Sequence, residues 1–349
     1  MKLNAAVFFG GRSREHEVSR NSAINIMSYL NPSKYNILPV YISKEGKWFL
    51  YDGSLTNIPD EIESFSALVT FSSKECSLLR IVGDKVRSVS VDIAVPALHG
   101  KYGEDGTIQG LFEMMNLPYV GCGPLASALA MDKTYTRLIA AASDIPITPY
   151  LVFTKNSDPE DSSKKIRSEL GYPCFIKPAS SGSSVGTNKA KNKKEIIAAL
   201  KEAFEIDNKV IVEKFIKGTE IECALLGEGE NTLVSIPGEI STPDDFYTYE
   251  AKYGNPLSKN IIPATVSEKT MEKAMYYSQK IFKAIGGSGL ARADFFVQEK
   301  TGKVFFNEIN TMPGFTNISM YPQLAFYMGL KPYELMDRLI ELGLRRASR

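Results

Sequence analysis

The first third of the chain alternates apolar runs with amphipathic segments. Apolar runs that end in glycine or polar residues predict strands at residues 4–11, 35–43 and 91–100. Residues 18–30 and 105–116 carry apolar positions at helical spacing and predict helices. Strands that alternate with helices in this order predict an α/β unit built on a mostly parallel sheet.

Two glycine-rich polar segments follow predicted strands in this unit. Residues 10–19 follow the first strand, and residues 99–107 follow the third. Ligands of such sheets bind beyond the carboxyl ends of the strands, so both segments are candidates for a binding site. Residues 44–90 break the alternation with polar turns and short β-like runs, and we expect them to form an insertion.

The rest of the chain mixes helices and strands in a less regular order. Helices are expected at residues 126–144, 192–207 and 267–287, and from Pro332 onward. Strands are expected at residues 172–178, 209–216, 221–228, 289–298 and 303–311, with 209–216 and 221–228 as an antiparallel pair. Asn192 with Glu195 predicts a capping box, and Ser267 predicts a second helix cap. The predicted division is an α/β domain over 1–125 and two α+β parts over 126–210 and 211–349.

Composition changes this picture little. The 349 residues are 44% hydrophobic and 23% charged, which is ordinary for a globular protein. Because 41 Lys and Arg nearly balance 40 Asp and Glu, no global field favours nucleic acid or an anionic membrane. No apolar run approaches the ~18 residues of a membrane span, and the N-terminal run is too short for a signal peptide. Four widely spaced cysteines favour free thiols over a disulfide framework or zinc site, which predicts a cytoplasmic protein.

The two late strands carry the most specific chemistry. Alternation places Arg292 and Asp294 on one face of the first strand, and Glu308 and Asn310 on one face of the second. A turn centred near Thr301 puts Asp294 opposite Glu308, with Cβ atoms ~5 Å apart. Two carboxylates at that distance repel unless a cation joins them, and oxygen ligands suit Mg²⁺ or Mn²⁺ shared with nucleotide phosphates.

The alternative for these carboxylates is a solvent-facing polar strand face. That alternative fits less well, because Phe295, Phe305 and Ile309 already supply an apolar side to the same hairpin. The sequence therefore favours a metal site, and this interpretation depends on the strand register.

Phosphate groups need donors as well as metal ions. Lys177 opens the loop 177–186, whose backbone N–H groups are suited to surround a phosphate, and Lys133 is a second candidate. The loop is not a Walker loop, in which the lysine comes near the end. The alternatives are a plain hairpin turn for the loop and an exposed helix charge for Lys133. Residues 213–220 offer exposed strand backbone, apolar side chains and an acid, a set suited to an adenosine whose ribose hydroxyls the acid would bind. The alternative is a simple hairpin with salt bridges at its rims.

Both histidines lie in glycine-bounded polar loops at predicted strand ends. We interpret His16 as a structural hydrogen-bonding residue, whereas His99 is equally compatible with a structural and a substrate-side role. Glu15 is a candidate partner for an ammonium group, and its alternative is an acid that stabilises a helix N-terminus.

Seven segments, taken in order, resemble the motifs of D-alanine–D-alanine ligases, which are ATP-grasp enzymes of peptidoglycan synthesis. They are "FFGGRSREHEVS", "HGKYGEDGTIQG", "GCGPLASALAMDK", "KPASSGSSVG", "EKFIKGTE", "ARADFF" and "NEINTMPGFTNISMYP". The resemblance extends over about residues 5–345. Each motif is modest alone, but the ordered set is highly specific.

The resemblance implies an α/β domain on the substrate side followed by a two-part ATP-grasp fold, in a homodimeric enzyme. By motif match, ATP would be bound by Lys133, Lys177, Ser184, Glu213, Lys214, Ile216 and Glu220. Two Mg²⁺ ions, replaceable by Mn²⁺, would be bound by Asp294, Glu308 and Asn310. Glu15 would hold the ammonium group of the first D-alanine, and Ser319 would contact the carboxylate of the second. Arg292 would contact the developing oxyanion, and His99 would lie near the substrates.

The reaction that the resemblance implies has two steps. The carboxylate of one D-alanine attacks the γ-phosphate of ATP, and the amine of the second D-alanine then attacks the resulting acyl phosphate. Arg292 would stabilise the oxyanion of the second step. Because water would hydrolyse the acyl phosphate, a lid is expected. Residues 242–264 are the candidate lid, since they are long and poor in apolar anchors.

The candidate lid also predicts which acceptor is used. It contains Lys252 and Tyr253, a pair typical of D-alanine-specific relatives, whereas relatives that accept D-lactate have His in place of the tyrosine. The resemblance further implies a catalytic hydrogen-bonded trio of Tyr253, Glu15 and Ser183.

Three alternatives stay open on the sequence alone. The first is a ligase variant of the same fold that joins D-alanine to D-serine or D-lactate. The second is a non-catalytic ATP-binding protein with this fold. The third, a dinucleotide-dependent dehydrogenase, is weakened because "GGRSRE" departs from G-x-G-x-x-G.

Overall fold

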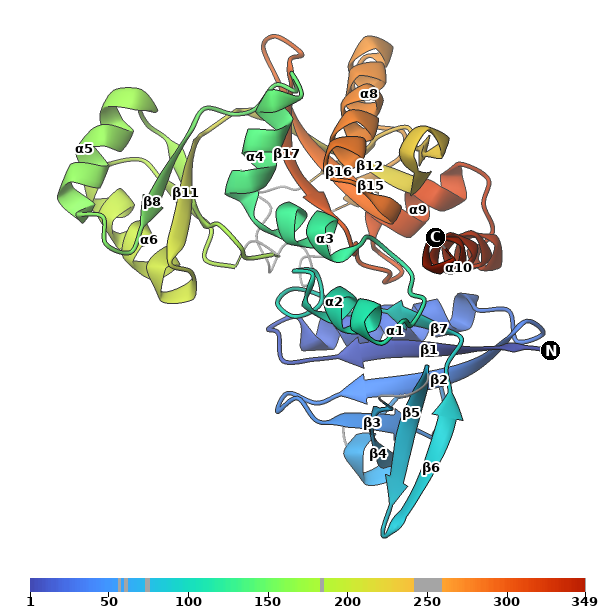
Figure 1. Cartoon of the computed structure of the whole chain (residues 1–349). Coiled ribbons are helices and arrows are strands. Elements are labelled where there is room, and N and C mark those ends of the chain that lie inside the picture. Colours follow the sequence, from blue (N-terminus) through green and yellow to red (C-terminus); the bar gives the residue numbers. More distant parts are fainter. Residues whose placement is uncertain (56–57, 60–61, 73–75, 183–184, 242–258, 349) are drawn as a thin grey trace.

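The computed structural model describes residues 1–55, 58–59, 62–72, 76–182, 185–241 and 259–348. Three sheets organise this part of the chain. In Figure 1 the N-terminal sheet lies at the bottom, the central sheet at the left, and the C-terminal sheet at the upper right. None of the described helices is both long and apolar enough to span a membrane.

The N-terminal sheet has the strand order β6-β5-β4-β3-β2-β1-β7. Its strands are β1 (Leu3–Gly10), β2 (Tyr35–Ile42), β3 (Trp48–Tyr51), β4 (Ser66–Phe71), β5 (Ser77–Val82), β6 (Lys85–Ser90) and β7 (Ile93–Pro96). Pairing is parallel between β1 and its neighbours β2 and β7, and antiparallel from β2 to β6. The three strands predicted for the parallel sheet pair in parallel, and only the strands within residues 44–90 add antiparallel pairs. Residues 44–90, expected as an insertion, extend this same sheet.

Strand β1 explains why the first apolar run is continuous. Val7 and Phe9 face a core shared with helix α1 (His16–Tyr29), whereas Phe8 faces a second core shared with helix α2 (Thr107–Met114). A strand buried on both faces has no polar side to show in its sequence. At its end Gly10 has φ 88°, and a Cβ there would lie 2.3 Å from the Ile42 carbonyl oxygen, so this turn requires glycine.

The helix expected at 126–144 is two helices, α3 (Pro124–Met131) and α4 (Lys133–Ala142). The break occurs because the Asp132 side chain accepts the backbone N–H of Thr134 at 2.9 Å and caps α4. Ala126, Ala130 and Ala140 pack in the core of the C-terminal sheet, so these helices belong by packing to the C-terminal part and not to the central part.

The central sheet is antiparallel and has the order β10-β9-β11-β8. Its strands are β8 (Tyr150–Thr154), β9 (Cys174–Pro178), β10 (Asn188–Ala190) and β11 (Lys209–Lys214), and helices α5 (Pro159–Glu169) and α6 (Lys193–Ile206) cover it. The Asn192 side chain caps α6 by accepting the N–H of Glu195 at 3.0 Å. The carboxylate of Glu195 accepts the N–H of Lys191 at 2.7 Å, one residue earlier than in a standard capping box.

The C-terminal sheet has the order β15-β14-β12-β16-β17, and β13 pairs with β12. Its strands are β12 (Gly218–Glu228), β13 (Leu233–Val234), β14 (Gly238–Ser241), β15 (Lys259–Ile261), β16 (Ser288–Gln298) and β17 (Val304–Asn310). Its helices are α8 (Glu268–Ala284), α9 (Met320–Tyr327) and α10 (Pro332–Ala347), with a short 3₁₀ turn η2 at Gly229–Asn231; a second 3₁₀ turn, η1 (Ile62–Phe65), lies between β3 and β4 of the N-terminal sheet. Ser267 caps α8 and Pro332 opens α10, as predicted.

Strands β11 and β12 do not form the predicted antiparallel pair. Strand β11 pairs with β8 and β9, whereas β12 pairs with β14 and β16, so residues 215–217 cross from one sheet to the other. The predicted boundary between residues 210 and 211 falls inside β11, and the central sheet continues to Lys214. The crossing places the end of β11 beside the C-terminal sheet, where the predicted phosphate and metal residues meet.

Helix α10 connects the C-terminal part to the N-terminal sheet. Its residues Leu335, Met336 and Leu339 share one core with Val7 and Phe9 of β1. The same core includes Ala224, Leu226 and Leu290 of the C-terminal sheet, which fixes the N-terminal strand ends relative to β12 and β16.

Candidate active site

The β16–β17 hairpin places Asp294 directly opposite Glu308, as predicted, and Arg292 opposite Asn310. The register shifts between Asp294 and Phe295, so Phe295 lies opposite Phe306 and a residue is left over on β17. Such a β-bulge breaks the simple count from the turn. The predicted facing of the two carboxylates is confirmed, although it arises through a bulge that the count did not include.

The bulge also changes which phenylalanine enters the core. Phe306 packs against Phe295 in the C-terminal core, with ring centroids 5.8 Å apart. Phe305, expected on that side, lies opposite Phe296 in the ladder and therefore shares the other face of the sheet with it. The prediction for Phe305 was wrong because strict alternation does not hold across a bulge.

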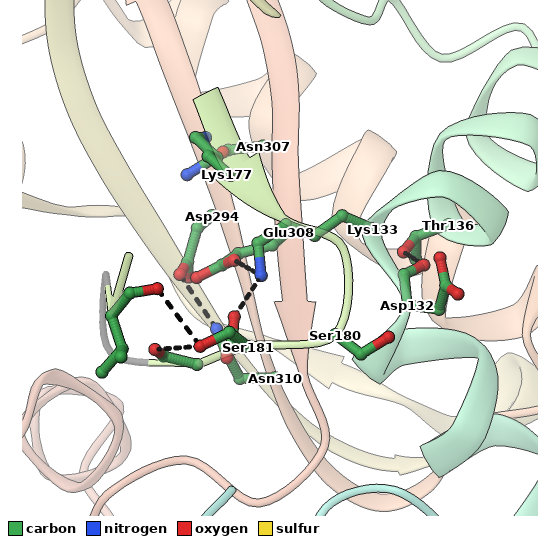
Figure 2. A network of polar contacts seen from close by, with 12 residues as sticks. Asp132, Lys133, Thr136, Lys177, Ser180, Ser181, Asp294, Asn307, Glu308 and Asn310 are labelled. Atoms are coloured by element: carbon green, nitrogen blue, oxygen red, sulfur yellow. Dashed lines mark hydrogen bonds and ion pairs between the residues drawn. The ribbon is translucent and has the colours of Figure 1, made fainter. Parts of the chain in front are cut away.

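Asp294 is the centre of a group that we call the metal-side cluster: Glu222, Arg292, Asp294, Glu308 and Asn310, with Lys133. Only 1% of the Asp294 side chain is exposed. Arg292 donates its Nε to Oδ1 of Asp294 at 2.8 Å and its Nη2 to Oδ2 at 2.6 Å. Asn310 donates Nδ2 to Oδ2 at 3.0 Å (Figure 2). Arg292 thus pairs with Asp294, a carboxylate that the sequence predicts as a metal ligand.

Lys133 connects this cluster to the loop 177–186. Its Nζ donates to the carbonyl oxygen of Ser181 at 2.6 Å and lies 3.4 Å from Oε2 of Glu308 (Figure 2). Lys133 is the first residue of α4 and is 9% exposed, so the alternative of an exposed helix charge is excluded.

A second charged group, the nucleotide-side cluster, consists of Arg137, Lys177 and Glu213. Lys177 Nζ lies 2.6 Å from the Glu213 carboxylate, and Arg137 binds the same carboxylate through Nε at 2.8 Å and through Nη2. Arg137 also donates Nη1 to the carbonyl oxygen of Asn307, the residue beside the bulge. Burial alone raises the pKa of Glu213, but Arg137 and Lys177 outweigh it and lower the pKa to about 2.

A cavity of about 100 Å³ lies beside the metal-side cluster. Its lining includes all four residues predicted on the substrate side: Glu15, His99, Arg292 and Ser319. They come from the start of α1, the loop after β7, strand β16 and the start of α9. The structure therefore brings together residues that are more than 300 positions apart in the sequence.

The chain is similar to proteins of one known family over most of its length. Residues 4–122 match the family described as D-ala D-ala ligase N-terminus, and residues 139–341 match D-ala D-ala ligase C-terminus. A D-alanine–D-alanine ligase of Acetivibrio thermocellus is 44% identical, and the match covers 99% of this chain and 96% of the relative. The chain belongs to the D-alanine–D-alanine ligase family. Members of this family are ATP-dependent ligases.

Solved structures of the family have the same fold. A D-alanine–D-alanine ligase from Coxiella burnetii superimposes with a TM-score of 0.88 at 36% identity, covering 99% of this chain and 95% of that one. The VanG D-Ala:D-Ser ligase from Enterococcus faecalis superimposes with a TM-score of 0.87 at 37% identity, covering 98% and 100%. The predicted ATP-grasp fold is thereby confirmed.

His99 is held by hydrogen bonds on both ring nitrogens. Nδ1 lies 3.2 Å from the carbonyl oxygen of Met312, and Nε2 lies 2.9 Å from Oγ of Ser22. A carbonyl only accepts, so Nδ1 carries the proton and Nε2 accepts from the serine. Burial lowers the pKa of His99, which keeps this ring neutral. His16 bonds the Gly11 carbonyl at 2.7 Å, in agreement with its structural interpretation.

Glu104 is an acid of this site that the sequence interpretation missed. It lies in the loop after β7, lines the same cavity as Glu15, and accepts the N–H of Gly100 at 2.9 Å. Burial raises its pKa and the charge of Glu15 adds to this effect, giving a pKa of about 8. A Cβ on Gly182 would lie 3.2 Å from Oε2 of Glu15 and 3.9 Å from Oε2 of Glu104, so the backbone at Gly182 packs directly on these two acids.

Arg137 and Glu222 were also missed, although both carry a periodic signal. Arg137 lies four residues after Lys133 on α4, which is the same helix face. Glu222 lies two residues after Glu220 on β12, which is the same strand face. Carboxylate oxygens of Glu220, Glu222 and Asp294 lie within 4.8 Å of one another, so the donor set around Asp294 fits a hard divalent cation.

Other predicted residues are placed less centrally. The Lys214 side chain is exposed at the end of β11, Ile216 is half-buried in the crossing, and Glu220 accepts from Nδ2 of Asn307 at 3.5 Å. Ser319 accepts the N–H of Thr316 at 3.0 Å. The predicted residues Ser183, Ser184, Lys252 and Tyr253, and positions 242–258 of the candidate lid, lie outside the described residues.

Proposed function

We propose that the protein uses ATP to join two molecules of D-alanine into a dipeptide, the activity that the names of its relatives state. The observation that carries this proposal is the cavity in which Glu15, His99, Arg292 and Ser319 converge beside the metal-side cluster. The protein would act in the cytoplasm as a homodimer that supplies the peptidoglycan precursor.

The first step transfers the γ-phosphate of ATP to the carboxylate of the first D-alanine. Phosphoryl transfer depends mainly on positioning and charge neutralisation. Lys133 and Lys177 would bind phosphate oxygens, and residues 213–220 would bind the adenosine. Asp294, Glu308 and Asn310 would hold two Mg²⁺ ions, which Mn²⁺ would replace. When bound, these ions would neutralise the phosphate charge and polarise the γ-phosphate.

The second step is attack by the amine of the second D-alanine on the acyl carbon. The new C–N bond forms, the C–O bond to phosphate breaks, and phosphate leaves with the electron pair and takes up the proton that the amine gives up. Arg292 would stabilise the oxyanion that develops on the acyl oxygen. Glu15 would hold the ammonium group of the first D-alanine, and Ser319 the carboxylate of the second. The neutral His99 ring would position this side of the cavity and take up no proton.

The trio of Tyr253, Glu15 and Ser183 would close the site over the substrates and select D-alanine as the acceptor, with Lys252 beside it. Tyr253→Phe would weaken this closure and loosen acceptor choice, and unchanged acceptor kinetics would count against the trio. Ser183→Ala would raise the KM for D-alanine more than the KM for ATP, whereas a plain phosphate loop would show the reverse.

A second candidate acceptor is D-serine, because the superposition on VanG D-Ala:D-Ser ligase is as close as that on a D-alanine–D-alanine ligase. Acceptor choice is a difference of affinities to which several pocket groups contribute. The two candidates therefore share the first step and differ only in the second.

The deciding experiment measures ADP release with Mg-ATP and D-alanine, L-alanine, or D-alanine mixed with D-serine or D-lactate. We expect release with D-alanine alone, little with L-alanine, and no large increase on adding D-serine or D-lactate. No release with D-alanine alone would overturn the proposed function. Mixed dipeptide as the main product would establish the second candidate.

A further inference from the structure

Glu222 is a buried acid that the proposed reaction does not use. It lies on β12 directly opposite Asp294 on β16, and 4% of its side chain is exposed. Its Oε2 lies 2.9 Å from Nε of Arg292. It also lines the cavity that contains Glu15 and Ser319.

The guanidinium of Arg292 therefore lies between two carboxylates. Asp294 accepts from both Nε and Nη2, whereas Glu222 contacts Nε from the neighbouring strand. If a divalent cation engages the oxygens of Asp294, Arg292 loses its bidentate partner. Glu222 is then the carboxylate that keeps contact with the arginine.

We propose that Glu222 is a positioning residue that holds Arg292 in the substrate cavity while Asp294 is engaged by a divalent cation. This inference rests on the proposed function, because it requires Asp294 to bind metal and Arg292 to meet the acyl group. A buried arginine left without a carboxylate would turn toward another acid or toward solvent, since an unpaired buried charge is costly.

The strand order argues against the alternative, in which Glu222 is itself a metal ligand. Strand β16 lies between β12 and β17, so Glu222 and Glu308 flank Asp294 on opposite sides. Neighbouring strands are ~4.8 Å apart, so Glu222 and Glu308 are separated by roughly twice that distance at the backbone. A cation held between Asp294 and Glu308 would therefore lie on the side of Asp294 away from Glu222, whose Oε2 contacts Nε of Arg292. A cation held between Asp294 and Glu222, whose carboxylate oxygens lie within 4.8 Å of each other, is the alternative that the Mn²⁺ measurement below decides.

The test compares Glu222→Gln, Glu222→Ala and Glu220→Gln with the wild type. Glu222→Gln keeps the size and an acceptor oxygen but removes the charge that holds Arg292. We expect kcat to fall about 10-fold in Glu222→Gln and about 100-fold in Glu222→Ala, with the KM for ATP unchanged within about twofold. Glu220→Gln removes an acid on the same strand face that the proposed function assigns to ATP, and we expect it to raise the KM for ATP instead.

Mn²⁺ binding supplies a readout that does not depend on turnover. Electron paramagnetic resonance of Mn²⁺, with a non-hydrolysable ATP analogue, should give the same affinity for Glu222→Gln and the wild type. Asp294→Asn should lower that affinity by about 10-fold or more. Equal losses of Mn²⁺ affinity in Glu222→Gln and Asp294→Asn would overturn the proposal and make Glu222 a ligand.

Two further outcomes are decisive. Unchanged kcat in both folded Glu222 variants, judged by wild-type circular dichroism, would also overturn the proposal. If Glu222→Ala fails to fold, the Gln variant alone decides the test. Ligase activity of the wild type is measured in parallel. If the wild type has none, the proposed function is refuted and this inference with it. If the wild type is active and the Glu222 variants keep the same kcat, only the inference is refuted.

Discussion

The nucleotide-side and metal-side clusters differ in their balance of positive and negative side chains. In the first, a single carboxylate, Glu213, is bound by two cations, Arg137 and Lys177. In the second, the cations Arg292 and Lys133 face more carboxylates than they can neutralise: Glu222, Asp294 and Glu308. The first cluster thus keeps an excess of positive charge, which suits phosphate, and the second keeps an excess of negative charge, which suits a divalent cation.

The two clusters also differ in what they connect. The nucleotide-side cluster joins α4, β9 and β11 and reaches β17 through the Asn307 carbonyl, so it bridges the central and C-terminal parts. The carboxylates of the metal-side cluster lie on neighbouring strands of one sheet. We therefore expect losses in the metal-side cluster to reduce activity, and loss of Arg137, which joins the two parts in the nucleotide-side cluster, to reduce stability.

The largest effect is expected for Asp294→Asn. This change removes the charge that would bind metal and the bidentate partner of Arg292, and we expect kcat/KM to fall by about 10³-fold or more. Initial rates of ADP release at increasing Mg²⁺ are the measurement. Near-normal activity at saturating Mg²⁺ would show that Asp294 does not belong to the metal site.

Arg137→Met should lower the free energy of unfolding by about 3 kcal/mol, because it leaves a buried carboxylate with one cation in place of two. Urea unfolding measures this loss, and Arg137→Lys is the matched control that keeps the charge and should recover part of it. A variant with wild-type stability and a large loss of kcat would reverse the comparison between the clusters.

Acid should weaken the nucleotide-side cluster in a defined window. The pKa of Glu213 is lowered to about 2, below its ordinary value of 4.5, so its contribution is fully present above pH 4.5 and is lost as the pH falls toward 2. A shift of this size corresponds to about 3 kcal/mol. Unfolding free energies of the wild type across this window should fall more steeply than those of Glu213→Gln. Parallel curves would contradict the lowered pKa.

The smallest effect is expected for Lys164→Ala. Lys164 pairs with Asp161 at 2.8 Å on the surface of α5, with side chains 70% and 76% exposed. Solvent and salt screen such a pair, so Lys164→Ala should not measurably change the urea midpoint of unfolding. The same urea measurement sets the scale against which the loss in Arg137→Met is judged.

The sequence predicted which residues share a strand face better than it predicted which strands pair with one another. Alternation identified Asp294 and Glu308, because period 2 is a local property of the strand. The bulge at Phe295 and the crossing between β11 and β12 depend on partner strands that are distant in the chain, and no local pattern encodes them. Arg137 shares a helix face with Lys133, but a lysine or arginine on a helix is interpreted as a surface charge until a buried acid such as Glu213 is placed beside it.

The most direct test of the central claim follows a carboxylate oxygen of the first D-alanine, the group that would receive the γ-phosphate. D-Alanine labelled with oxygen-18 in its carboxyl group is incubated with unlabelled Mg-ATP, and the released phosphate is analysed by mass spectrometry. If the two clusters transfer the γ-phosphate to the substrate carboxylate, each phosphate carries one labelled oxygen. Unlabelled phosphate, formed together with ADP, would show that water receives the phosphoryl group and would contradict the account.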